Sequence, residues 1–217
     1  MSKSGVIISG GYVNREFADE FLKKEKPDVI IGADSGLRYL YHSNICPTHI
    51  VGDFDSVPRE VIDYYRSLQT IPIREFNPVK DATDTEIAIR YAIELGVEKL
   101  WILGATGSRV DHMLANIQSL KIALDAGVEA YMVDECNRIR LLKGAISLRK
   151  EDAFGDYFSV FPLGGNVEHF SISGAKYPLY EHTLCSFDSL CVSNEIEGET
   201  HITFPEGNVI LIESRNP

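Results

Sequence analysis

Apolar and polar positions follow one pattern before about residue 138 and another after it. In the first part, short continuous apolar runs are separated by segments whose apolar residues keep the spacing of one helix face. Strands that alternate with helices form a mainly parallel sheet covered on both faces. The expected strands are residues 6–8, 29–31, 49–51, 70–73, 100–103 and 130–133, and the expected helices lie near 17–22, 37–41, 58–68, 87–95 and 114–124.

After residue 138 the helical spacing disappears, and short alternating segments are separated by turn signals such as residues 163–166 and 205–208. This pattern predicts a second, antiparallel β domain, a small sandwich. We therefore expect an α/β domain over residues 1–137 and a β-sandwich domain over residues 138–217. The expected strands of the sandwich are residues 139–142, 157–161, 167–172, 189–192, 201–204 and 208–212.

The polar, glycine-rich loops of the first part all follow expected strands. In an open α/β sheet, ligands bind outside the carboxyl ends of the strands. The positions of these loops therefore predict a ligand site at that edge. They are residues 10–11, 32–36, 52–56 and 104–109.

Two acidic clusters lie in this region, Asp53 with Asp55 and Asp81 with Asp84. In an extended segment, residues two apart face the same side, so Asp53 and Asp55 are expected to point together. Clustered carboxylates repel one another, and without His or Cys neighbours they favour Mg²⁺ or Ca²⁺. Each cluster alone fits a capped turn equally well, because Asp and Ser are ordinary turn residues. The two together favour a cation site.

The loop at residues 104–109 precedes an expected helix. Its backbone N–H groups and the Arg109 guanidinium suit phosphate, although a tight strand-to-helix turn would use the same residues. Asp34 is similarly either a ligand for a ribose or base, or the cap of the helix that follows. His112 stands out among the six histidines because it follows Asp111 next to this loop.

The composition of the chain excludes some classes of binding partner. With a net charge of −11, the 217-residue chain lacks the basic footprint that nucleic acids or anionic membranes require. No apolar run reaches membrane-spanning length, and no signal peptide is recognisable. The four cysteines have no metal-binding spacing, so we expect reduced thiols in a cytoplasmic protein, with a Cys185–Cys191 disulfide as the alternative.

Taken in order, the motifs resemble those of the thiamine pyrophosphokinase family across nearly the whole chain. The resemblance depends on residues 32–36 (GADSG), 52–56 (GDFDS), 81–86 (DATDTE), 104–112 (GATGSRVDH) and 193–195 (SNE). Ser108 stands where the bacterial pattern usually has a second glycine, and a serine fits there if its φ is negative.

The resemblance implies Mg²⁺-dependent transfer of a pyrophosphoryl group from ATP to the hydroxyl of thiamine, giving AMP and thiamine diphosphate, by a homodimer. It implies that residues 1–137 bind ATP and Mg²⁺, and that residues 138–217 bind thiamine and dimerise. It assigns Mg²⁺ to Asp53, Asp55 and Asp84, and catalysis to Asp81, Arg109 and Asp111. It assigns ATP to Asp34, Ser35, Gly104, Thr106, Gly107, Arg109, Asp111 and His112, and thiamine to Ser193 and Asn194.

Other functions fit the same acidic motifs. A metal-dependent nucleotide phosphohydrolase would use the carboxylates to activate water. A non-catalytic nucleotide-binding regulator would bind ATP without forming a product. A pyrophosphokinase acting on a pterin alcohol would keep the chemistry and change the acceptor. The motif at residues 193–195 favours thiamine.

Overall fold

The computed structural model describes residues 2–76 and 82–216. The predicted catalytic residue Asp81 lies outside the described residues. The chain divides into two compact units, Met1–Glu135 and Cys136–Pro217. Within the described ranges, no helix is long and apolar enough to cross a membrane.

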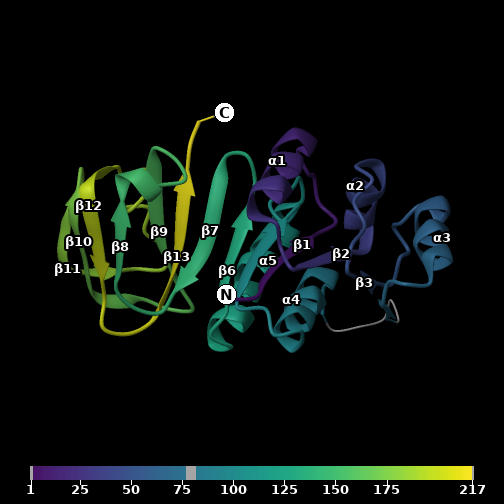
Figure 1. The fold of residues 1–217 in the computed structure, drawn as a ribbon. Coiled ribbons are helices and arrows are strands. Elements are labelled where there is room, and N and C mark those ends of the chain that lie inside the picture. Colours follow the sequence, from purple (N-terminus) through teal and green to yellow (C-terminus); the bar gives the residue numbers. More distant parts are fainter. Residues whose placement is uncertain (1, 77–81, 217) are drawn as a thin grey trace. The chain divides into compact units, whose positions relative to one another are not determined.

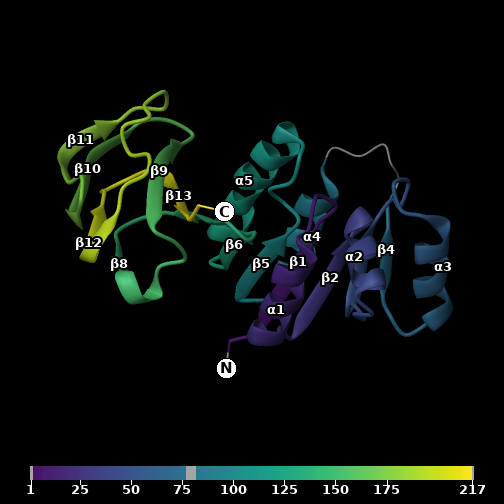
Figure 2. The ribbon, with the colours of Figure 1, turned by 90° about the horizontal axis from the view of Figure 1, so that it is seen from above.

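In the described part of the first unit, six parallel strands lie in the order β4-β3-β2-β1-β5-β6 (Figures 1 and 2). From β1 the chain builds outward to β4 on one side and then returns to place β5 and β6 on the other. The order of strands therefore reverses between β1 and β5, which is the point where open α/β sheets bind ligands. The strands are β1 (Ser4–Ile8), β2 (Val29–Ala33), β3 (His49–Gly52), β4 (Ile73–Glu75), β5 (Lys99–Leu103) and β6 (Glu129–Val133).

Helices cover both faces of this sheet, with α1 on one face and α4 and α5 on the other (Figure 2). On the α1 face, Phe21 packs edge-on against Trp101 of β5, with ring centroids 5.7 Å apart. The sheet interior is buried on both sides, as its continuous apolar runs predict. The helices are α1 (Arg15–Glu25), α2 (Leu37–His42), α3 (Arg59–Leu68), α4 (Asp84–Glu94) and α5 (Val110–Asp125), with a short 3-10 turn, η1 (Asp34–Gly36), before α2.

The second unit is a β-sandwich. Three antiparallel strands, β7-β13-β9, and a four-stranded antiparallel sheet, β11-β10-β12-β8, enclose a core that includes Phe158, Phe170 and Leu211. The strands are β7 (Asn137–Leu142), β8 (Ile146–Arg149), β9 (Tyr157–Leu163), β10 (Val167–Ala175), β11 (Leu179–Leu184), β12 (Ile196–Thr203) and β13 (Asn208–Ser214), and η2 (Lys150–Asp152) follows β8.

This architecture confirms the predicted fold, an open, mainly parallel sheet followed by a smaller antiparallel sandwich. One expected strand, residues 189–192, is wrong, because that segment is a turn in which the Val192 N–H donates to the Ser189 carbonyl oxygen at 3.3 Å. Its apolar residues do not form a face, since Cys191 alone is buried while Leu190 and Val192 are exposed. Strands β8 and β11 were missed because each buries only one side chain fully.

Candidate active site

A cavity of about 360 Å³ opens at the carboxyl ends of the strands, where the order of the sheet reverses. Its volume lies within the range of small-molecule sites, roughly 300–1,000 Å³. The loops that follow β1, β2, β3 and β5 contribute to it, as does the N-terminus of α4. The lining residues are Ser9, Gly10, Gly11, Asp34, Ser35, Ser56, Thr83, Asp84, Thr85, Gly104, Ala105, Gly107, Ser108, Arg109, His112 and Asn116.

The loops after β1 and β5 contact each other through their backbones. The Gly11 N–H donates to the Gly104 carbonyl oxygen at 2.9 Å, and the Ser9 N–H donates to the Leu103 carbonyl oxygen at 2.8 Å. Gly104 has a φ of +69°, and a Cβ there would lie 2.6 Å from the Ser9 carbonyl oxygen. Only glycine fits this position. Ser108 does not have positive φ, so a serine is compatible with the loop.

Three carboxylates gather beside the cavity. Asp34, Asp53 and Asp55 each offer an oxygen that lies within 4.8 Å of the other two. Asp34 enters from η1, directly after β2, and the other two follow β3. The expected extended conformation of residues 53–55 is wrong, because the chain turns at Phe54, whose φ is +60°. The Asp55 N–H donates to Asp53 Oδ1 at 3.3 Å within this turn, which keeps the two acidic residues together.

Asp34 carries the clearest sign of a cation-binding role. Its Oδ1 atom is buried and has no hydrogen-bond partner within the described chain, while Oδ2 accepts from the Ser35 hydroxyl at 3.0 Å. Burial raises the pKa of Asp34, and the charges of Asp84 and Asp53 raise it further. A buried carboxylate oxygen beside two other carboxylates fits a hard divalent cation such as Mg²⁺. The donor set therefore suits the predicted metal.

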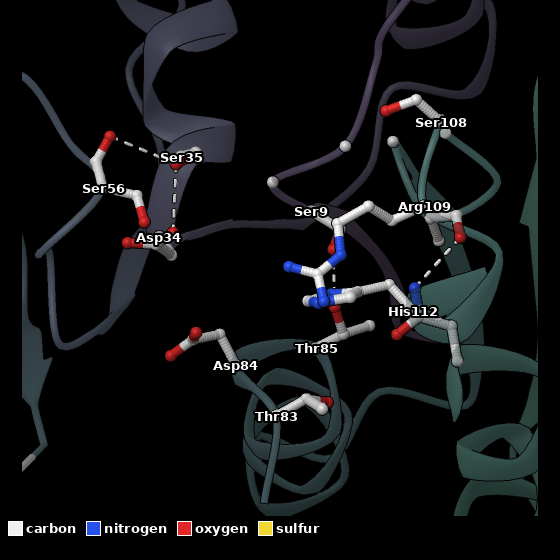
Figure 3. A pocket seen from close by; sticks show the side chains of 16 residues that line it. Ser9, Asp34, Ser35, Ser56, Thr83, Asp84, Thr85, Ser108, Arg109 and His112 are labelled. Atoms are coloured by element: carbon white, nitrogen blue, oxygen red, sulfur yellow. Dashed lines mark hydrogen bonds between the residues drawn. The ribbon is translucent and has the colours of Figure 1, made fainter. Parts of the chain in front are cut away.

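Asp84, which was also predicted to bind the metal, is the first residue of α4 and lines the cavity. It is not part of the three-carboxylate group, but its charge acts on Asp34. Thr83 caps α4, its hydroxyl accepting from the Glu86 N–H at 3.2 Å. The expected capped turn is thus present, and the same cap places Asp84 at the cavity. Figure 3 shows Asp34 and Asp84 facing the same space.

Arg109 and Asp111 form a forked ion pair at the start of α5. Arg109 Nε and Nη2 lie 3.1 and 2.6 Å from the two Asp111 oxygens. The bonds from Arg109 and from the His112 N–H lower the pKa of Asp111 to about 2. Arg109 and His112 line the cavity with Gly104, Gly107 and Ser35, whereas Asp111 and Thr106 are not among the described residues that line it.

Among the lining residues that the sequence did not assign to the site, three are polar and buried. The Ser9 and Thr85 hydroxyl oxygens lie 2.5 Å apart and are buried, and Asn116 donates from Nδ2 to the Ala105 carbonyl oxygen at 3.0 Å. The signal for Asn116 was a polar residue next to the apolar positions Ile117 and Leu120 of the helix, which are buried with it. The local sequence around Ser9 and Thr85 carries no such signal, since the two residues are 76 positions apart.

The predicted thiamine residues lie in the second unit. Asn194 is buried, and its carboxamide holds the backbone of Tyr177, accepting from its N–H at 3.0 Å and donating to its carbonyl oxygen at 2.8 Å. Ser193 is exposed, has a φ of +56°, and donates its N–H to the Ser159 hydroxyl oxygen at 3.0 Å. Asn194 thus fixes the turn that presents Ser193 to solvent.

Comparison with known proteins agrees with this arrangement. A family model described as "Thiamin pyrophosphokinase, catalytic domain" matches residues 22–132, and one described as "Thiamin pyrophosphokinase, vitamin B1 binding domain" matches residues 144–209. The thiamine pyrophosphokinase of Bacillus subtilis (strain 168) is 30% identical over 210 residues, which cover 96% of this chain and 97% of that protein.

Solved structures give the same result. The crystal structure of thiamine pyrophosphokinase from Bacillus subtilis has a TM-score of 0.87 at 26% identity, covering 99% of this chain and all of that one. The thiamin pyrophosphokinase from Geobacillus thermodenitrificans has a TM-score of 0.83 at 29% identity, with 98% of each chain covered. The chain belongs to the thiamine pyrophosphokinase family.

Proposed function

We propose that this protein transfers the pyrophosphoryl group of ATP to the hydroxyl of thiamine, giving AMP and thiamine diphosphate. The observation that carries the proposal is the group of three carboxylates beside a cavity at the switch point of the sheet, in a chain that both thiamine pyrophosphokinase family models match. Neither the phosphohydrolase nor the pterin alternative is favoured by these matches.

Asp34, Asp53 and Asp55 would hold Mg²⁺. Asp84, whose charge acts on Asp34, would lie near the cation. The cation would neutralise the charge of the phosphates and help to orient them. Asp34 takes a place in this set that the sequence assigned to Asp84. Its unpartnered, buried oxygen is the reason for the change.

The triphosphate would lie between the acidic group and the loop after β5. Arg109 would contact phosphate oxygens, and Asp111 would orient its guanidinium through the forked ion pair. With Gly10, Gly11, Gly104 and Gly107 in the lining, backbone groups can approach the ligand closely.

The reaction needs little covalent help from the chain. The thiamine oxygen attacks the β-phosphorus in line, the bond to the α-phosphate oxygen breaks, and AMP leaves. Positioning and charge neutralisation supply most of the rate. Asp111 is a poor acceptor for the alcohol proton, because its pKa is about 2 and both its oxygens face Arg109. We therefore assign the proton to Asp81 rather than to Asp111.

Residues 138–217 would bind thiamine through Ser193, held in place by Asn194, and would form a homodimer. Exposed large apolar side chains in this unit support a protein partner, because a monomer leaves them in water. They are Tyr177, Tyr180, Phe187, Leu190 and Val192. Light scattering after size exclusion tests the dimer. The four cysteines of the whole chain are all free thiols, which supports a cytoplasmic location.

The activity is tested by phosphorus NMR of the purified protein with ATP, Mg²⁺ and thiamine, beside a mixture without thiamine. AMP and thiamine diphosphate should appear together, in the complete mixture alone. Phosphate or pyrophosphate release without thiamine would instead indicate a hydrolase. An unchanged ATP spectrum in both mixtures would refute the proposal, and pterin alcohols would then be tried as acceptors.

A further inference from the structure

The hydroxyl groups of Ser9 and Thr85 form an isolated pair at the wall of the cavity. Their oxygens are 2.5 Å apart, and the two residues are 4% and 6% exposed. Ser9 follows β1, and Thr85 is the second residue of α4. Both line the cavity, beside Asp84 (Figure 3).

The pair has two hydroxyl hydrogens, but the hydrogen bond between the two residues takes up only one of them. Each hydroxyl carries one hydrogen, and the bond between them consumes one, whichever residue donates. Neither oxygen has another hydrogen-bond partner within residues 2–76 and 82–216. One O–H donor is therefore left over in a buried position whose open side is the cavity. Buried donors are nearly always paired, so an acceptor from the ligand is expected there.

The surroundings favour an anionic oxygen as that acceptor. Thr85 lies in the first turn of an eleven-residue helix, where backbone N–H groups have no intrahelical partner and the helix dipole is positive. Arg109 lines the same cavity. We propose that the Ser9–Thr85 pair donates a hydrogen bond to a phosphate oxygen of the bound nucleotide. This inference rests on the proposed function, since it needs ATP in the cavity.

The backbone around the two residues restricts the direction in which the remaining hydroxyl hydrogen can point. Ser9 is fixed by its backbone bond to Leu103, and Thr85 is fixed by the cap at Thr83. The remaining hydroxyl therefore has few orientations open to it. The pair would act as a binding and positioning element, joining the loop after β1 to the helix that carries Asp84.

Calorimetric titration with ATP and, separately, with adenosine tests the proposal. The double variant Ser9→Ala with Thr85→Val removes both hydroxyls at nearly constant volume. Because a hydrogen bond to a charged group is involved, ATP affinity should fall roughly tenfold to a hundredfold. Adenosine affinity should stay unchanged, since it has no phosphate. Thr85→Ser keeps both hydroxyls and should bind ATP as the wild type does.

Ser119→Ala is the matched control, because Ser119 is a buried serine whose hydroxyl donates to Ala115 at 2.9 Å, away from the cavity. Equal loss of ATP and adenosine affinity in the double variant would overturn the inference, because a distorted cavity weakens both. Unchanged ATP affinity would overturn it as well. If the wild type itself fails to bind ATP, the proposed function falls and the inference falls with it. Thermal unfolding of each variant identifies any loss of fold, and Thr85→Val alone then replaces the double variant.

Discussion

Replacing Asp34 by Asn should make the protein more stable and should abolish the cation binding that we propose for this group. Asn keeps the shape of the side chain and tolerates the φ of +44° that Asp34 adopts. Its carbonyl oxygen can still accept from the Ser35 hydroxyl. The change therefore removes a charge and little else.

The gain in stability follows from the repulsion that the change relieves. At the 4.8 Å limit of the group, two unit charges repel by about 3.5 kcal/mol at an effective dielectric of 20 and by about 0.9 kcal/mol at 80. Asp55 is exposed and Asp53 half-buried, which favours the lower figure for both pairs. The repulsion of Asp34 with Asp53 and with Asp55 then adds up to about 2 kcal/mol. This is equivalent to a rise in Tm of about 6 °C for a protein of this size.

The effect should depend on pH with a definite sign. The pKa of Asp34 is raised by burial in the folded protein, so the carboxyl is protonated and harmless below its unfolded value of about 3.9. The wild type loses stability relative to the variant as pH rises through the folded pKa of Asp34, because the buried carboxyl then becomes charged. Wild type and Asp34→Asn should therefore unfold alike near pH 4, and the variant should gain its advantage at higher pH.

Thermal unfolding with and without Mg²⁺ completes the assay. Mg²⁺ at 100 times its Kd stabilises a protein that binds it by about 2.7 kcal/mol. Mg²⁺ should raise the Tm of the wild type and leave that of the variant nearly unchanged. An equal Mg²⁺ shift in both proteins, together with no gain in Tm for the variant at neutral pH, would refute the assignment of these carboxylates to a cation.

The remaining predictions concern other parts of the chain. Asp55→Ala should abolish turnover without loss of fold by circular dichroism, and near-normal activity would contradict its role at the metal. Gly104→Ala should lower ATP affinity and Tm more than Gly96→Ala, because both have positive φ but only Gly104 would place its Cβ 2.6 Å from a backbone oxygen; equal effects would argue against the clash. Arg138→Ala should cost about 3–5 kcal/mol in urea unfolding, since it leaves Glu213, 2% exposed, without its forked partner; a cost below 1 kcal/mol, roughly that of a surface pair, would contradict this. Iodoacetamide at pH 8 should modify exposed Cys46 and spare Cys191, whose burial raises its pKa to about 11, as peptide mass spectrometry would report; equal labelling of the folded protein would refute the protection.

Local patterns predicted the elements of this protein well, and the reason is physical. Continuous apolar runs such as Val6–Ile8 in β1 belong to strands buried on both faces, and that environment permits few other residues. Strands β8 and β11 were missed because each has a single fully buried residue, so few of their positions need apolar side chains. The turn at residues 189–192 was mistaken for a strand because Leu190, Cys191 and Val192 form a continuous apolar run, although only Cys191 is buried.

The composition of the site was harder to predict than its position. The loops after the strands were expected to meet, but which loops touch depends on the order of the strands in the sheet. That order places the loop after β2 next to the loop after β3, and so brings Asp34 to Asp53 and Asp55. It also places Ser9 against Thr85, because β1 and β5 are neighbours at the reversal and α4 precedes β5. Neither pairing leaves a trace in local spacing.

The backbone at the acidic group supports a ligand role independently of the charges. Asp34 and Phe54 both have positive φ, which is costly for a residue as bulky as Phe. Phe54 offsets this cost by burial, with 7% of its surface exposed. The buried ring holds the turn, and the turn holds Asp53 and Asp55 near Asp34, where their charges repel. Both the strained turn and the repulsion work against folding, and a divalent cation bound by all three carboxylates removes the second of these costs. The same geometry that destabilises the protein alone therefore prepares it to bind the metal without rearrangement.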